Sequence, residues 1–285
     1  MSNTEGSRSR SILQNAQLAL LLEVSSTPKP GNVDRVREYD DLRFEHFVTG
    51  AVGALDGLKL AAEGGPVGAA FEQAVEGMSQ QSGGNTQFGA LLLVTPLAVG
   101  ASRGELTRER ASEVVTRTTV GDAVDFYTAF DHVGVAVDDP PEGIAAPDVS
   151  LGSDAGPLLR EREMTLADVM AESAEIDGLA AEWTDGFPRT FETARRIESR
   201  DGPVTGRAAA VFLELLAEEI DTFVVTQHDR ETALEVRDRA RAALDGEEEI
   251  SEMAEEFIER EINPGTTADI IAGGLFVALE RGLEV

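Results

Sequence analysis

A lysine held between two prolines is the feature of this sequence that most strongly suggests chemistry. Lys29 lies within residues 23–35, EVSSTPKPGNVDR, directly after an apolar run. The prolines and the glycine that follows them fix a rigid turn. The 24 lysine and arginine residues include only two lysines, Lys29 and Lys59. A lysine kept in such a turn predicts an exposed, functional cation.

Two later segments combine glycine with small polar residues just before an apolar run. They are residues 83–89, GGNTQFG, and residues 263–269, NPGTTAD. Each is typical of a helix start, where Asn and Thr cap the backbone and Thr266 with Asp269 forms a capping box. Each also suits a phosphate, because free N–H groups and the positive end of the helix dipole attract anions. The sequence leaves both interpretations open.

Several carboxylates lie near these segments or at helical spacing. Glu23 ends the first apolar run, where it is either buried and tuned or turned outward. Asp122 and Asp125 lie one turn apart, which suits Mg²⁺, although such pairs are mostly solvated in an acidic chain. Asp221 follows an amphipathic stretch, and His228 lies just beyond it. A lone histidine is more typical of a surface or packing position than of a catalyst.

The charge of the chain excludes some classes of partner. The formal net charge is −29, from 53 acidic and 24 basic residues. Nucleic acids and anionic membranes need a basic face, so we expect neither as a partner. An acidic interaction surface and adaptation to high salt both fit, and the even spread of acids favours high salt. With no cysteine and no apolar run near the ~20 residues of a membrane span, we expect a cytoplasmic protein that is possibly a homo-oligomer.

Apolar residues recur at helical spacing almost throughout, for example at Val211, Phe212, Leu215 and Leu216. This pattern predicts an all-α, single-domain multi-helix bundle of about ten helices spanning residues 1–285. We expect residues 1–10 to be flexible. Residues 131–163 contain four prolines and little apolar periodicity, which predicts one long irregular loop.

Taken in order, these segments resemble the triphosphoribosyl-dephospho-CoA synthase family. The resemblance covers roughly residues 15–280 and rests on EVSSTPKPGNVDR, GGNTQFGA, DTFVV and NPGTTAD. It implies an all-helical fold and a reaction in which ATP loses adenine and its triphosphoribosyl group is attached to dephospho-CoA. Gln87 and Phe88 depart from the usual His and basic residue of the second motif. The usual histidine after the first motif has no clear counterpart, with His46 nearby. An archaeal-type branch with another acceptor fits these departures.

The resemblance also implies roles for individual residues. Breaking a ribosyl C1′–N9 bond builds positive charge that a carboxylate stabilises, and the acceptor hydroxyl needs a general base. We assign catalytic roles to Glu23, Lys29, Asp34 and Asp221. We assign ATP binding to Lys29, Gly31, Asn32, Arg35, Gly84, Asn85, Thr86, Gly265, Thr266 and Thr267. We assign Mg²⁺ binding to Asp34, Asp122 and Asp269.

Two other functions remain open from the sequence. The first is a non-catalytic all-α protein that binds a nucleotide or a partner on the same scaffold, which the departures at Gln87 and Phe88 favour. The second is a Mg²⁺-dependent enzyme that releases pyrophosphate, which explains the acids but leaves the Pro–Lys–Pro turn without a purpose.

Overall fold

The computed structural model describes residues 10–135 and 145–285, and every regular element in this part of the chain is helical. The all-α prediction is confirmed. The expectation of flexibility at 1–10 falls almost entirely outside the described residues. The elements, in chain order, are α1 (Ile12–Ser25), α2 (Phe44–Gly53), α3 (Leu55–Ala62), α4 (Val67–Met78), α5 (Phe88–Ser102), α6 (Arg108–Thr116), α7 (Val120–Thr128), η1 (Ala129–Asp131), η2 (Val149–Ala155), α8 (Gly156–Glu161), α9 (Leu166–Ser173), α10 (Gly178–Asp185), α11 (Pro188–Glu198), α12 (Val204–Glu218), α13 (Thr222–Gln227), α14 (Arg230–Leu244), α15 (Ile250–Glu259) and α16 (Gly265–Glu280).

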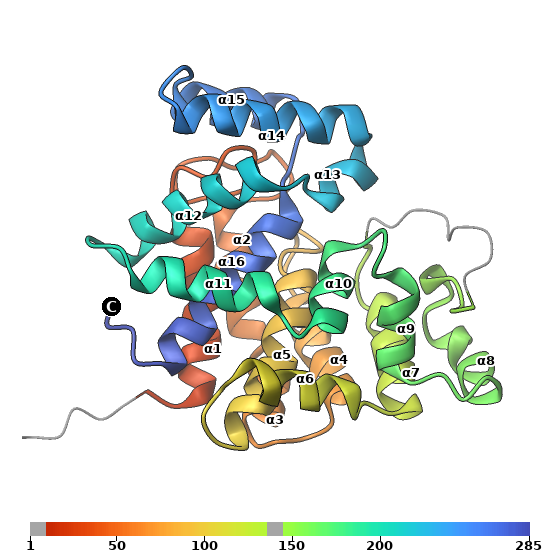
Figure 1. Cartoon of the computed structure of the whole chain (residues 1–285). Coiled ribbons are helices and arrows are strands. Elements are labelled where there is room, and N and C mark those ends of the chain that lie inside the picture. Colours follow the sequence, from red (N-terminus) through yellow and green to blue (C-terminus); the bar gives the residue numbers. More distant parts are fainter. Residues whose placement is uncertain (1–9, 136–144) are drawn as a thin grey trace, which may run out of the picture.

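The core is built around two helices, α5 and α16, that are buried on nearly all sides. A helix that is apolar all round can only be accommodated inside the protein. Helix α16 packs against α1, α5 and α11 (Figure 1). A Cβ on Gly274 would lie 2.3 Å from Thr193 Cγ2 of α11, so glycine permits this close approach. The polar segments at residues 83–89 and 263–269 lie at the N-terminal ends of these two central helices.

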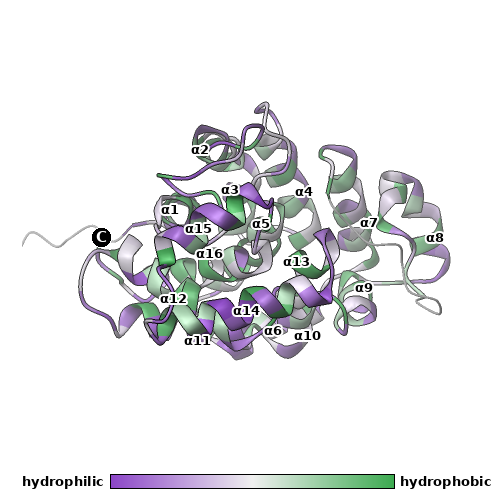
Figure 2. Ribbon diagram, turned by 90° about the horizontal axis from the view of Figure 1, so that it is seen from above, coloured by the Kyte–Doolittle hydropathy of each residue, from purple (hydrophilic) through white to green (hydrophobic). Residues whose placement is uncertain are grey.

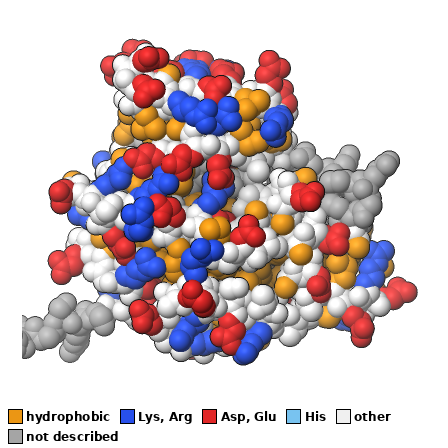
Figure 3. Space-filling view, in the orientation of Figure 1, with side chains coloured by type: hydrophobic (Ala, Val, Ile, Leu, Met, Phe, Trp, Pro, Cys, Tyr) orange, Lys and Arg blue, Asp and Glu red, His pale blue; other side chains and the backbone are white. Residues whose placement is uncertain are grey.

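The outer helices are amphipathic and turn their polar sides to solvent. Figure 2 shows hydrophilic residues along the outward faces of α14 and α15, while α16 at the centre is largely apolar. Acidic and basic side chains are interspersed on the face seen in Figure 3. Arg239, for example, pairs with both Glu248 and Glu256. In the described part of the chain, no helix is long and apolar enough to cross a membrane.

The expectation of one irregular loop over residues 131–163 is wrong for its second half. Residues 149–161 form η2 and α8, whereas 136–144 lie outside the described residues. One aspartate and one proline that suggested a loop, Asp148 and Pro157, act instead as helix-start signals. Asp148 Oδ1 accepts a hydrogen bond from the Ser150 N–H at 2.8 Å, and Pro157 occupies the first turn of α8.

Candidate active site

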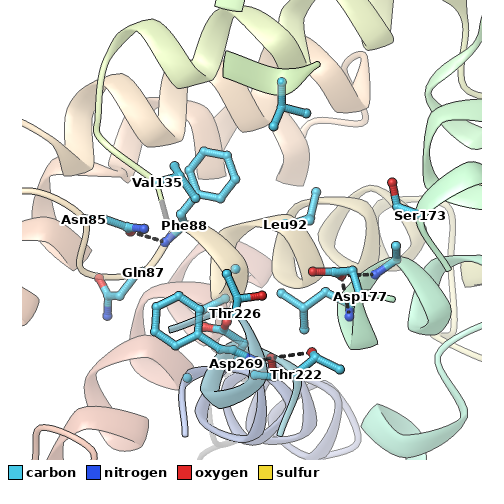
Figure 4. A pocket seen from close by; sticks show the side chains of 18 of the residues that line it. Asn85, Gln87, Phe88, Leu92, Val135, Ser173, Asp177, Thr222, Thr226 and Asp269 are labelled. Carbon is cyan, nitrogen blue, oxygen red and sulfur yellow. Dashed lines mark hydrogen bonds between the residues drawn. The ribbon is translucent and has the colours of Figure 1, made fainter. Parts of the chain in front are cut away.

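One cavity of about 290 Å³ opens among the N-terminal ends of α5, α10, α13 and α16 (Figure 4). Its walls combine aromatic side chains with carboxylates. The aromatic residues are Phe47, Phe88, Phe126, Tyr127, Phe130 and Phe223, and the acids are Glu23, Asp148, Asp177 and Asp269. No lysine or arginine is among the described residues that line it. The cavity suits a ligand with a flat apolar part. A phosphate group could bind there only with a cation that offsets the negative charge of the acids.

The three polar segments of the sequence meet at this cavity. The first contributes Glu23 and Asn32, the second Asn85 and Thr86, and the third Gly265, Thr266 and Asp269. The first and third segments are also hydrogen-bonded to each other, because Asn32 Nδ2 donates to Asn263 Oδ1 at 2.9 Å. Seven of the residues assigned from the sequence are therefore brought together, from parts of the chain more than 200 residues apart.

Lys29 is not the exposed cation that the sequence predicts. Its side chain is fully buried, forms an ion pair with Glu23, and donates to Asn32 Oδ1 at 2.6 Å. Lys29 is absent from the cavity lining, whereas both of its partners belong to it. Burial raises the pKa of Glu23, and the Lys29 ammonium opposes that rise. Lys29 thus positions the Glu23 carboxylate and Asn32 at the cavity wall.

The remaining members of the first motif shape the turn. Asp34 is buried, and its oxygens accept from the N–H groups of Lys29, Val36 and Arg37. Gly31 has a φ of 76°, and a Cβ there would lie 2.1 Å from the Ile262 carbonyl oxygen. Arg35 is exposed. None of Gly31, Asp34 and Arg35 lines the cavity, and the same is true of Gly84 in the second motif.

Asp221 ties two helix starts together. Its Oδ1 caps α13 by accepting from the N–H groups of Phe223 and Val224, and its Oδ2 accepts from Thr267 N and Oγ1, both at 2.7 Å. Burial raises the pKa of Asp221, and these hydrogen bonds oppose the rise. Neither Asp221 nor Thr267 is part of the cavity lining. With both oxygens engaged, Asp221 fits a structural role.

Asp122 also has a structural place. It closes the capping box of α7 with Thr119, and its Oδ1 accepts from the Gly68 N–H at 2.8 Å. The structure therefore does not bring Asp122 to the cavity. A separate cluster, Glu72, Glu76 and His132, places three possible metal-ligand atoms within 4.8 Å of one another. It too lies outside the cavity lining.

Asp269 is the central acid of the cavity. Its Oδ2 lies against Gly89, where a Cβ would come within 2.0 Å, and the Ala90 N–H of α5 hydrogen-bonds to it. Burial raises the pKa of Asp269 well above its usual range, and the carboxylates of Glu23, Asp221 and Asp177 raise it further. Among the described residues, Asp269 has no ion-pair partner. A bound divalent cation would relieve this repulsion.

Sequence reasoning missed Asp177, Gln87 and the aromatic wall. Asp177 caps α10, with Oδ1 accepting from Leu179 N and Ala180 N at 2.8 and 2.7 Å. An Asp-Gly pair before an apolar stretch is a helix-start signal that would have located it. The aromatic residues carry no such signal, because phenylalanine in a helix pattern is indistinguishable from core.

Comparisons with known proteins agree with this picture. The family model described as CitG, ATP:dephospho-CoA triphosphoribosyl transferase, matches residues 9–284. A comparison with curated proteins finds no match. Among solved structures, a protein from Archaeoglobus fulgidus, provisionally described as a triphosphoribosyl-dephospho-CoA synthase, is similar in fold. The TM-score is 0.67 at 24% identity, and the alignment covers 82% of this chain and 98% of the other. The match over nearly the whole chain shows that this protein belongs to the ATP:dephospho-CoA triphosphoribosyl transferase family and is a transferase enzyme.

Proposed function

We propose that this protein transfers the triphosphoribosyl group of ATP to a hydroxyl of dephospho-CoA or of a related cofactor precursor. The C1′–N9 bond of ATP breaks, and its electron pair leaves with adenine. A new bond forms between C1′ and the acceptor oxygen, and the proton of the acceptor hydroxyl ends on adenine. The observation that carries the proposal is a cavity that combines an aromatic wall with four carboxylates, among them the buried Glu23, in a chain of this family.

Two carboxylates suit the two tasks of this reaction. Glu23 forms an ion pair with Lys29 at the cavity wall, and this ammonium favours the charged carboxylate, which can stabilise the positive charge that builds at C1′. Asp269 has no such cation, and its raised pKa brings it closer to neutral pH. A carboxylate of that kind is an effective general base for the acceptor hydroxyl. Different environments thus separate the roles of two similar groups.

The triphosphate brings more negative charge into a cavity whose described lining residues include no lysine or arginine. Helices α5, α10 and α16 present their N-terminal ends there, and their dipoles favour anions. We propose that Mg²⁺ supplies the remaining positive charge. Oxygen ligands are what Mg²⁺ prefers, and Asp177 together with oxygens of the triphosphate would hold it, which leaves Glu23 and Asp269 free for the reaction. This assignment replaces the metal set predicted from the sequence, because Asp34 and Asp122 do not line the cavity and Asp269 acts as the base.

The proposal is tested by incubating the protein with ATP, Mg²⁺ and dephospho-CoA in molar KCl and measuring free adenine. Asp269→Asn should slow adenine release by about 100-fold or more, as loss of a general base does. Asp125→Asn is the matched control, because Asp125 is a partly buried acid that does not line the cavity. Equal rates in Asp269→Asn and the parent, or adenine release that ignores the acceptor, would contradict the proposal.

A further inference from the structure

The carboxamide of Gln87 is buried beside the cavity without a hydrogen-bond partner. The side chain is 3% exposed, and neither Nε2 nor Oε1 has a partner among the described residues. Thr86 Oγ1 next to it also lacks one. These are three of the five buried side-chain atoms without partners in the described part of the chain. Leaving buried polar atoms unpaired is costly, so their concentration at one place indicates a missing ligand.

The surroundings of Gln87 favour a flat ligand. Figure 4 shows Gln87 next to Asn85 at one side of the cavity. A Cβ on Gly50 of α2 would lie 2.6 Å from Thr86 Oγ1 and 3.4 Å from Gln87 Oε1, so this glycine face lies against both groups. Phe47 lies one helical turn before Gly50, on the same side of α2, and also lines the cavity. One corner of the cavity lining therefore brings together an unpaired carboxamide and an aromatic side chain.

We propose that Gln87 binds the adenine of ATP through its N6 amino group and N7, with Phe47 packed against the ring. This inference rests on the proposed function and names the nucleobase subsite within it. A carboxamide carries one donor and one acceptor in one plane, and this pair is complementary to the N7 acceptor and the N6 donor of adenine. Guanine presents two acceptors on the same edge, N7 and O6, so Gln87 Oε1 would face an acceptor. The contact selects adenine over guanine.

The same contact assists the chemistry. When the C1′–N9 bond breaks, the departing base carries the electron pair, and its negative charge spreads onto N7. The Nε2–H group of Gln87, donating to N7, then forms a stronger hydrogen bond than it does to intact ATP. An interaction that strengthens in the transition state raises the rate of the chemical step and not only the affinity.

The test measures binding of free adenine by calorimetry, without Mg²⁺ or acceptor. The parent should bind adenine more tightly than purine, which lacks the amino group, and than 7-deazaadenine, which lacks N7. Gln87→Leu should bind adenine about 10- to 100-fold more weakly and bind all three bases alike. Gln80→Leu, which changes an exposed glutamine on the approach to the same loop, should keep the parental order.

A second measurement separates ligand binding from a structural role. Because Leu removes two unpaired buried polar atoms, the ligand-free Gln87→Leu protein should melt at the parental temperature or above it. A clear fall in the melting temperature, or unchanged base preference in this variant, would overturn the inference. Failure of the proposed function looks different, since adenine would then bind through Gln87 while no acceptor causes adenine release. Adenine that does not bind to the parent would also overturn it.

Discussion

Replacing Lys29 should strongly destabilise the protein, although a lysine in a turn looks dispensable from the sequence. Lys29→Met leaves the Glu23 carboxylate and Asn32 Oδ1 in the interior without their cation. Removing one partner of a buried ion pair costs about 3–5 kcal/mol, and at about 2 °C per kcal/mol the thermal midpoint should fall by about 6–10 °C. Thermal unfolding in molar KCl measures this directly.

Lys59→Met is the matched control, because the other lysine of the chain is exposed and lies 4.0 Å from Glu63 on the surface. It should change the stability by less than about 0.5 kcal/mol. The double variant Lys29→Met/Glu23→Gln should recover much of the loss, since no unpaired charge then remains buried.

The loss in Lys29→Met should also depend on pH. Burial already raises the folded-state pKa of Glu23, and loss of the opposing Lys29 ammonium raises it further, so the destabilisation should be smaller at about pH 5 than at about pH 8. A Lys29→Met protein that melts with the parent at every pH would refute the buried-pair reasoning.

Three further outcomes follow from the charges of the site and the surface. Asp269→Asn should be more stable than the parent at neutral pH and lose this advantage below about pH 4. The pKa of Asp269 is raised in the folded state, so ionisation of this group destabilises the parent as the pH rises. Melting curves measured against pH test this. Stability should increase from dilute buffer to molar KCl, since screening a net charge of −29 outweighs weakening of surface pairs such as Arg239–Glu256; a midpoint indifferent to salt would contradict this. ATP should bind tightly only with Mg²⁺, so calorimetry with equal affinity in its absence would remove the metal from the site.

The fold and the location of the site could largely be predicted from the sequence, because both depend on local patterns. Helical spacing of apolar residues predicts helices, and glycine-rich polar segments before apolar runs predict helix starts. The central helices α5 and α16 both begin at the cavity, so the segments that contain Asn85 and Asp269 meet there.

The burial of individual side chains could not be predicted, because it depends on which segments pack over a turn. Lys29 is buried through contacts with Glu23 and Asn32, and Asn263 extends this network from the far end of the sequence. Asp221 and Asp122 have the residue type expected of catalytic or metal-binding groups, yet their oxygens are taken by neighbouring helix starts. The side-chain carboxamide of Gln87 has no hydrogen-bond partner among the described residues, which only coordinates can show.

The central claim is tested most directly by the products formed from ATP and dephospho-CoA with Mg²⁺ in molar KCl. Liquid chromatography with mass spectrometry should find one free adenine for each dephospho-CoA that gains a triphosphoribosyl group, in the parent and in Asp125→Asn but not in Asp269→Asn. Adenine without an adduct, or ADP with phosphate or AMP with pyrophosphate in place of adenine, would contradict the account.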